Sequence, residues 1–96
     1  IEKIKEIISN YFNINVKELS GPSRKQEYVY ARQLTVYILK TKYNQTLTSI
    51  GSALGGRDHA TISHAFDKIQ DAINSDPNIK EDVDNLISTL DKQYKM

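Results

Sequence analysis

Apolar residues recur every three or four positions through most of this chain, which is the spacing of one face of an α-helix. The pattern predicts helices over about 1–13, 16–20, 26–43, 46–54 and 58–74, and a last one from 77 to near the C-terminus. Asn, Gly and Pro separate these segments, and no alternation typical of a strand occurs. We therefore predict an all-α fold with about six helices around one core.

Capping residues support several of these boundaries. Asn15, Thr46 and Asp76 each stand at or immediately before the start of a predicted helix, where a short polar side chain accepts a hydrogen bond from a free backbone N–H. Pro77 then occupies the first helical turn, where its missing N–H has no cost. The glycine pair at 55–56 follows the fourth helix, and glycine readily adopts the left-handed conformation that ends helices.

The fourth helix, the glycine pair and the fifth helix follow one another closely along the chain. The fifth helix has two distinct faces. Its apolar stripe consists of Ile62, Ala65, Phe66, Ile69, Ala72 and Ile73. A second face, at i, i+4, i+7 and i+11 spacing, consists of Arg57, Thr61, His64 and Lys68. Two helices joined by a tight turn, the second with a free polar face, are typical of helix-turn-helix DNA-binding proteins.

Size and composition restrict the function without identifying it. The chain has 96 residues, 39% of them hydrophobic, so we predict a single domain over residues 1–96. There is no cysteine, which excludes disulfides and thiolate metal sites. No apolar run reaches the roughly 18–20 residues of a membrane span. Because the chain starts at Ile1 and not at Met, we expect it to be a fragment of a longer protein.

Charge is distributed unevenly along the chain, although the net charge is only +1. Residues 23–68 hold seven basic and three acidic side chains, a net charge of +4. Residues 69–96 hold three Lys and six Asp or Glu, a net charge of −3. The basic part contains the helix-turn-helix pattern, as expected for contact with phosphates. Chance clustering of solvated charges is the alternative explanation.

Three motifs stand out: Arg32-Gln33, Leu47-x-x-Ile50-Gly51 and Gly55-Gly56-Arg57-Asp58-His59-x-Thr61-x-x-His64-Ala65. Together they resemble the C-terminal DNA-binding domain (domain IV) of DnaA, the bacterial chromosomal replication initiator. The resemblance covers nearly the whole chain. It implies a Trp-repressor-like helix-turn-helix fold that binds double-stranded DNA at the nine-base-pair DnaA box of the replication origin. It also implies a cytoplasmic, nucleoid-associated protein of which this chain is the C-terminal fragment.

The resemblance implies base contacts in the major groove by Asp58, His59, Ala60 and Thr61, and in the adjacent minor groove by Arg24. A carboxylate accepts hydrogen bonds from cytosine or adenine amino groups, and methyl groups contact thymine. Asp58 is also suited to cap the recognition helix, and the alternative for Arg24 is a solvated surface side chain. Ala60 stands where the family usually has a hydroxyl residue, so we expect box recognition with altered stringency.

Contacts to the DNA backbone form a second set. The residues that match the family's backbone-contacting positions are Arg32, Gln33, Lys40, Arg57 and His64. Leu47 and Thr48 offer backbone N–H groups at a helix N-terminus, which is a ready phosphate site. Lys68 lies one turn beyond His64, and we include it among the predicted backbone contacts because of this spacing alone. Arg57 has an alternative role, which is to support the turn through a buried hydrogen bond.

Other functions have less support. His59 and His64 are separated by about 140° around a helix, which is not the spacing of zinc helices, so we expect no metal. The sequence contains no arrangement of a nucleophile with its base and no P-loop, so we expect no enzyme activity and no cofactor. The resemblance implies that the family's ATPase lies in a separate upstream domain, where we expect ATP to bind. A helix-turn-helix transcription regulator, which usually dimerises on palindromes, and a protein-interaction module built on the C-terminal amphipathic helix remain alternatives. We expect one monomer per box, with replication-regulatory proteins as further partner candidates.

Overall fold

In the computed structural model, residues 1–94 are described and form six helices and no strand. The helices are α1 (Glu2–Phe12), α2 (Val16–Ser20), α3 (Gln26–Thr41), α4 (Leu47–Ala53), α5 (His59–Ser75) and α6 (Pro77–Gln93). Each corresponds to a helix predicted from the apolar pattern. The all-α prediction is therefore confirmed, with boundaries that shift by a residue or two at a helix end.

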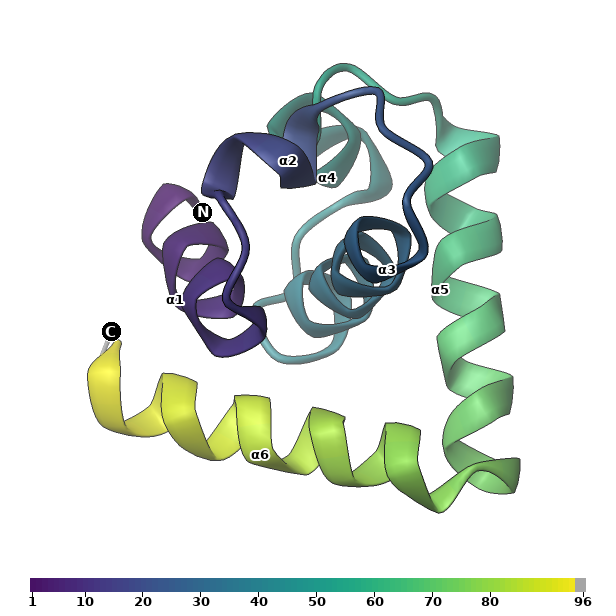
Figure 1. Ribbon diagram of the computed structural model, residues 1–96. Coiled ribbons are helices and arrows are strands. Elements are labelled where there is room, and N and C mark those ends of the chain that lie inside the picture. The colour runs from purple at the N-terminus through teal and green to yellow at the C-terminus, as the bar shows by residue number, and fades with distance from the viewer. Residues whose placement is uncertain (95–96) are drawn as a thin grey trace.

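Helix α3 runs through the middle of the molecule (Figure 1) and packs against each of the other helices. Helices α5 and α6 meet near Asp76 and form an L that bounds two sides of α3 (Figure 1). Helices α1 and α2 lie on the side of α3 away from α5. The segment between α2 and α3 contacts the turn before α5, because Arg57 donates to the carbonyl of Gly21 at 2.6 Å. This arrangement places the α2–α3 connection and the helix-turn-helix on one side of the molecule.

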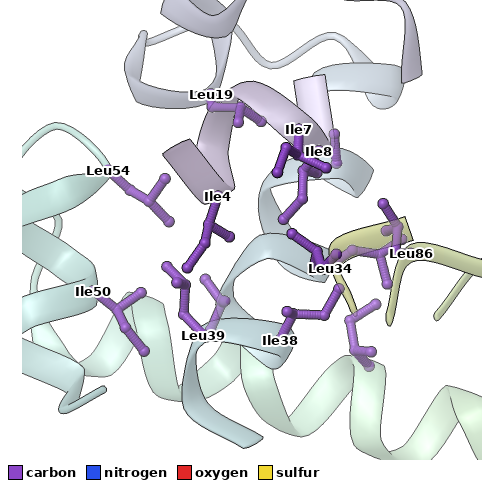
Figure 2. Close-up of a cluster of buried hydrophobic side chains, with 14 of the residues drawn as sticks. Ile4, Ile7, Ile8, Leu19, Leu34, Ile38, Leu39, Ile50, Leu54 and Leu86 are labelled. Atoms are coloured by element: carbon purple, nitrogen blue, oxygen red, sulfur yellow. The ribbon is translucent and has the colours of Figure 1, made fainter. Parts of the chain in front are cut away.

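The core lies between α3 and the helices around it. Ile8 of α1, Leu34 of α3 and Leu86 of α6 are 0% exposed and meet in the middle of the close-up in Figure 2. Ile50 and Leu54, from α4 and its end, are also fully buried and attach the helix-turn-helix to the same core. Burying each such side chain contributes about 1.5–3 kcal/mol relative to leaving it exposed, so the core fixes the frame on which the surface residues sit.

The predicted helix caps are present. The side chains of Asn15, Thr46 and Asp76 accept hydrogen bonds from backbone N–H groups at 2.9, 3.0 and 2.9 Å respectively. Gly55 and Gly56, which follow α4, have φ angles of 85° and 80°. These left-handed values strain any residue with a Cβ atom, so the glycine pair is required by the backbone of the turn.

A polar cluster ties α1, α3 and α6 together. Tyr30 of α3 donates its hydroxyl to Oδ2 of Asp82 at 2.6 Å, and Tyr11 of α1 donates to Oδ1 of the same carboxylate at 3.3 Å. Burial, followed by the hydrogen bond to Asp82, raises the pKa of Tyr30. The phenol therefore stays a neutral donor across the physiological pH range.

Candidate nucleic-acid interface

The turn between α4 and α5 is held by close backbone contacts. The N–H groups of Gly56 and Arg57 both donate to the carbonyl of Gly51, at 2.9 and 3.0 Å. A Cβ atom on Gly51 would lie 2.2 Å from the Arg57 carbonyl oxygen, and one on Gly55 would lie 2.3 Å from that of Ser20. Both distances are impossible for real atoms, so these glycines let α4, the turn and the end of α2 pack together.

The N-terminus of α5 projects four consecutive polar or small residues to the surface. Asp58 caps the helix, because its Oδ1 accepts a hydrogen bond from the backbone N–H of Thr61 at 2.9 Å. This bond lowers the pKa of Asp58, so the carboxylate is ionised near neutral pH. Asp58, His59, Ala60 and Thr61 are all exposed. The capping role is confirmed, and the base contacts stay a prediction.

His59 also connects the two helices of the motif. Its Nε2 is hydrogen-bonded to the hydroxyl of Thr48, in the first turn of α4. Both residues are exposed, so the pair lies on the surface next to the cap of α5. Leu47, the first residue of α4, is half-buried and packs its side chain against the core. Thr48 therefore orients a predicted base-contacting side chain, whereas its own phosphate contact stays a prediction.

A groove of about 670 Å³ lies between α3 and the N-terminal part of α5. It brings together seven of the residues predicted to contact DNA: Arg32, Gln33, Arg57, Ala60, Thr61, His64 and Lys68. The second face predicted for the fifth helix therefore forms one continuous surface with α3. Val29 and Val36 line the same groove, and we did not predict them as part of the site; Val36 also belongs to the buried core. They lie on the same helical face as Gln33, one turn before it and one turn after it, and this spacing could have identified them from the sequence.

Two further predicted residues lie outside this groove. Lys40 extends from α3 toward α5, where its Nζ lies 5.5 Å from the centroid of the Phe66 ring. Arg24 is exposed in the connection between α2 and α3, and its side chain makes no hydrogen bond or ion pair with residues 1–94. The neighbouring Lys25 pairs with Glu27 at 3.4 Å, so the nearby negative charge is already compensated.

Arg32 is bonded to the end of α2. Its Nε donates to the carbonyl of Leu19 at 2.9 Å, and its Nη2 donates to the carbonyl of Glu18 at 2.8 Å. The guanidinium also donates to the carbonyls of Gly21 and Ser23, at 3.2 and 3.3 Å. Burial lowers the pKa of Arg32, and the positive charge of Arg57 lowers it further. The phosphate contact predicted for Arg32 stays untested, but its N–H groups are already used by carbonyl oxygens.

Arg57 supports the turn through hydrogen bonds, which is the role given above as the alternative to a phosphate contact. Its Nη2 donates to the carbonyl of Gly21 at 2.6 Å, and its Nη1 donates to the carbonyl of Leu54. The side chain is half-buried, and burial lowers its pKa. One guanidinium thus bridges the end of α4 and the connection after α2.

Lys5 is a structural residue that sequence reasoning missed. Its side chain is only 7% exposed, and its Nζ donates to Ser20 Oγ at 2.8 Å and to the Ala53 carbonyl at 2.7 Å. A cation satisfies the free carbonyl groups at a helix C-terminus, here that of α4. The position of Lys5 could have indicated this role, because it lies on the same helical face as the apolar residues Ile1, Ile4 and Ile8.

Within residues 1–94, no group of three or more His, Asp or Glu side chains is arranged to hold a metal ion. In the same part of the chain, no helix combines the length and the apolar character that crossing a bilayer requires.

Comparison with known proteins identifies the family. The model of the family described as bacterial dnaA protein helix-turn-helix matches residues 1–69. Proteins named chromosomal replication initiator protein DnaA, from Lactococcus lactis, Levilactobacillus brevis and Acinetobacter baylyi, are 35%, 36% and 40% identical over 90%, 94% and 94% of this chain. The chain spans about a fifth of their length, 19%, 20% and 19% respectively. This chain therefore belongs to the bacterial DnaA helix-turn-helix family.

Proposed function

We propose that this domain binds double-stranded DNA sequence-specifically at DnaA boxes and delivers a bacterial replication initiator to the origin. The observation that carries the proposal is the exposed N-terminus of α5 beside a groove whose lining includes Arg32, Gln33, Arg57, His64 and Lys68. The domain acts as one monomer per box on the nucleoid in the cytoplasm. It performs no catalysis and holds no cofactor, and ATP control belongs to another domain of the full-length initiator.

Base recognition is assigned to the first turn of α5. A carboxylate facing phosphates is repelled, whereas one facing base edges accepts hydrogen bonds from cytosine or adenine amino groups. Oδ1 of Asp58 forms the helix cap, and we assign the exposed carboxylate a second role as an acceptor from a base. His59, Ala60 and Thr61 supply a ring N–H and methyl groups for the neighbouring bases. Arg24, on the adjacent connection, enters the minor groove, where a narrow A·T-rich segment attracts a guanidinium.

Backbone contacts are assigned to Gln33, Lys40, His64 and Lys68. Their side chains make no hydrogen bond to other residues within the described part of the chain, so their donors are available to phosphates. Phosphate contacts fix the position and orientation of a protein on the duplex but carry no direct sequence information. They therefore set affinity and its salt dependence, while the first turn of α5 and Arg24 set specificity.

Fluorescence anisotropy with two labelled duplexes tests the proposal. One duplex contains a single DnaA box, the other contains the same bases scrambled, and both are titrated over a salt series. We expect tight binding to the box at one protein per duplex, and weaker, more salt-dependent binding to the scrambled sequence. Equal binding to both duplexes would overturn sequence specificity. Two proteins per duplex, with a preference for palindromes, would indicate the dimeric transcription regulator instead.

A further inference from the structure

The connection of residues 21–25, which carries Arg24, is fastened to the helix-turn-helix at its start. Ser20 donates its hydroxyl to the carbonyl of Ala53 at 3.2 Å, and the buried Nζ of Lys5 donates to both of these groups. The end of α2 is thereby joined to the end of α4. A Cβ at position 55 would touch the Ser20 carbonyl at 2.3 Å, so the two backbones are already in contact there.

Two arginines extend this attachment into the connection itself. Arg57 bridges the Leu54 carbonyl, at the end of α4, and the Gly21 carbonyl in the connection. Arg32 of α3 donates to the same Gly21 oxygen and to the Ser23 carbonyl, next to Arg24. The backbone on the N-terminal side of Arg24 is therefore held from the turn before α5 and from α3 at once.

The hydrogen-bond partners of both guanidinium groups indicate that these groups hold the protein backbone in place. The last carbonyl groups of a helix lack intrahelical partners, and a guanidinium satisfies several of them with its fixed fork of donors. Neither Arg32 nor Arg57 pairs with a carboxylate, since all four ion pairs among residues 1–94 involve lysines. Both side chains are half-buried, and their donors point to neutral carbonyl oxygens of the protein.

We propose that Arg57 and Arg32 are positioning residues that hold the 21–25 connection, and with it Arg24, in a fixed place relative to α5. The inference rests on the proposed function and assigns these two residues a role other than phosphate contact. A connection already ordered in the free domain avoids the entropy cost of ordering it on the DNA. The minor-groove arginine and the first turn of α5 then engage the duplex as one rigid unit.

The substitution Arg57→Lys separates positioning from phosphate contact. Lysine keeps the positive charge that a phosphate contact needs, but a single ammonium lacks the planar fork that joins two carbonyls. The experiment is a double-mutant cycle of Arg57→Lys with Arg24→Ala, measured by anisotropy on the box and scrambled duplexes over a salt series. Lys68→Ala, which removes an exposed cation from the same groove, is the matched control.

The proposal predicts a specific pattern. Arg57→Lys weakens box binding by about tenfold in the wild-type background but by less than about twofold in the Arg24→Ala background, because contacting or dependent residues are non-additive. Its salt slope stays unchanged. Lys68→Ala instead adds fully to Arg24→Ala and lowers the slope by about 0.9. Additive losses for Arg57→Lys, or a slope that falls as in the control, would overturn the proposal.

Amide hydrogen exchange of the free domain provides a readout that needs no DNA. Arg57→Lys should accelerate exchange of the Lys25 amide, whose N–H donates to Ser23 Oγ at 3.3 Å within the connection, while the amides of α6 keep their wild-type protection. Unchanged exchange in the connection would also overturn the proposal. If Arg57→Lys does not fold, Arg32→Lys is taken through the same cycle. Failure of the proposed function has a different outcome, because the wild-type domain would then bind the box and scrambled duplexes equally.

Discussion

The two sides of α3 differ in whether their polar side chains are paired with one another. On the side of α1 and α6, the hydroxyls of Tyr11 and Tyr30 both donate to Asp82, so donors and acceptor satisfy one another. On the side of α5, Arg24 and Lys68 are exposed and make no ion pair within residues 1–94. Paired polar groups stabilise a fold, whereas Arg24 in the 21–25 connection and Lys68 at the groove have no such partner among residues 1–94. The difference separates the side that maintains the fold from the side that is available to a ligand.

The largest expected effect lies on the folding side. Leu86 of α6 is fully buried, and Leu86→Ala should lower the free energy of unfolding by about 2–5 kcal/mol through lost burial and a cavity. Urea unfolding followed by circular dichroism measures this loss. Anisotropy on the box duplex, at a temperature where the variant is folded, should show wild-type affinity. A large loss of affinity in the folded variant would show that the two sides are not separable.

The sequence predicted the helices and the polar face of α5 because both depend on local spacing and local caps. The roles of Lys5, Arg32 and Arg57 depend on carbonyl groups at the ends of α2 and α4, and only the packed fold brings these groups to the side chains. A cation on a helical face has the same sequence pattern whether it contacts a phosphate or a distant carbonyl. Spacing therefore indicated a polar face on the fifth helix but did not separate the side chains that bind distant carbonyls from the exposed ones.

The second prediction concerns the first turn of α5. His59→Ala should weaken box binding by about 1–3 kcal/mol, the usual value of a specific base contact, and should weaken scrambled DNA less. Thermal unfolding should change little, because His59 is exposed and bonded only to the exposed Thr48. The matched variant Thr48→Val tests the orientation of the ring, and we expect a smaller loss with the same preference for the box. Equal losses on both duplexes would contradict the assignment of His59 to specificity.

The third prediction concerns the contribution of the Tyr30 hydroxyl to the stability of the fold. Tyr30→Phe removes the 2.6 Å hydrogen bond to Asp82 but keeps the ring that packs against the core. We expect a loss of about 0.5–1.5 kcal/mol in the free energy of unfolding, the net value of one intramolecular hydrogen bond. Urea unfolding at neutral pH checks this value. Tyr11→Phe, which removes the longer 3.3 Å bond to the same carboxylate, should cost less.

The smallest predicted effect tests whether a cation that already has a partner behaves differently from those at the groove. Lys42 pairs with Asp91, and this hydrogen bond raises the pKa of Lys42. Because the pKa is higher in the folded state, the pair's stabilisation is fully present below about pH 10.4, the ordinary lysine value, and is lost as pH rises through the folded-state pKa. Asp91→Asn should therefore cost about 0.2–1 kcal/mol near neutral pH.

Two controls sharpen this last test. The stability difference between wild type and Asp91→Asn, measured by urea unfolding, should shrink at alkaline pH and at high salt, because partly exposed pairs are screened. Asp84→Asn, in the more exposed pair of Lys80 with Asp84, should cost less still. Neither substitution should change the salt slope of DNA binding. A changed slope would place Lys42 in the electrostatic surface that meets DNA and would extend that surface beyond the groove.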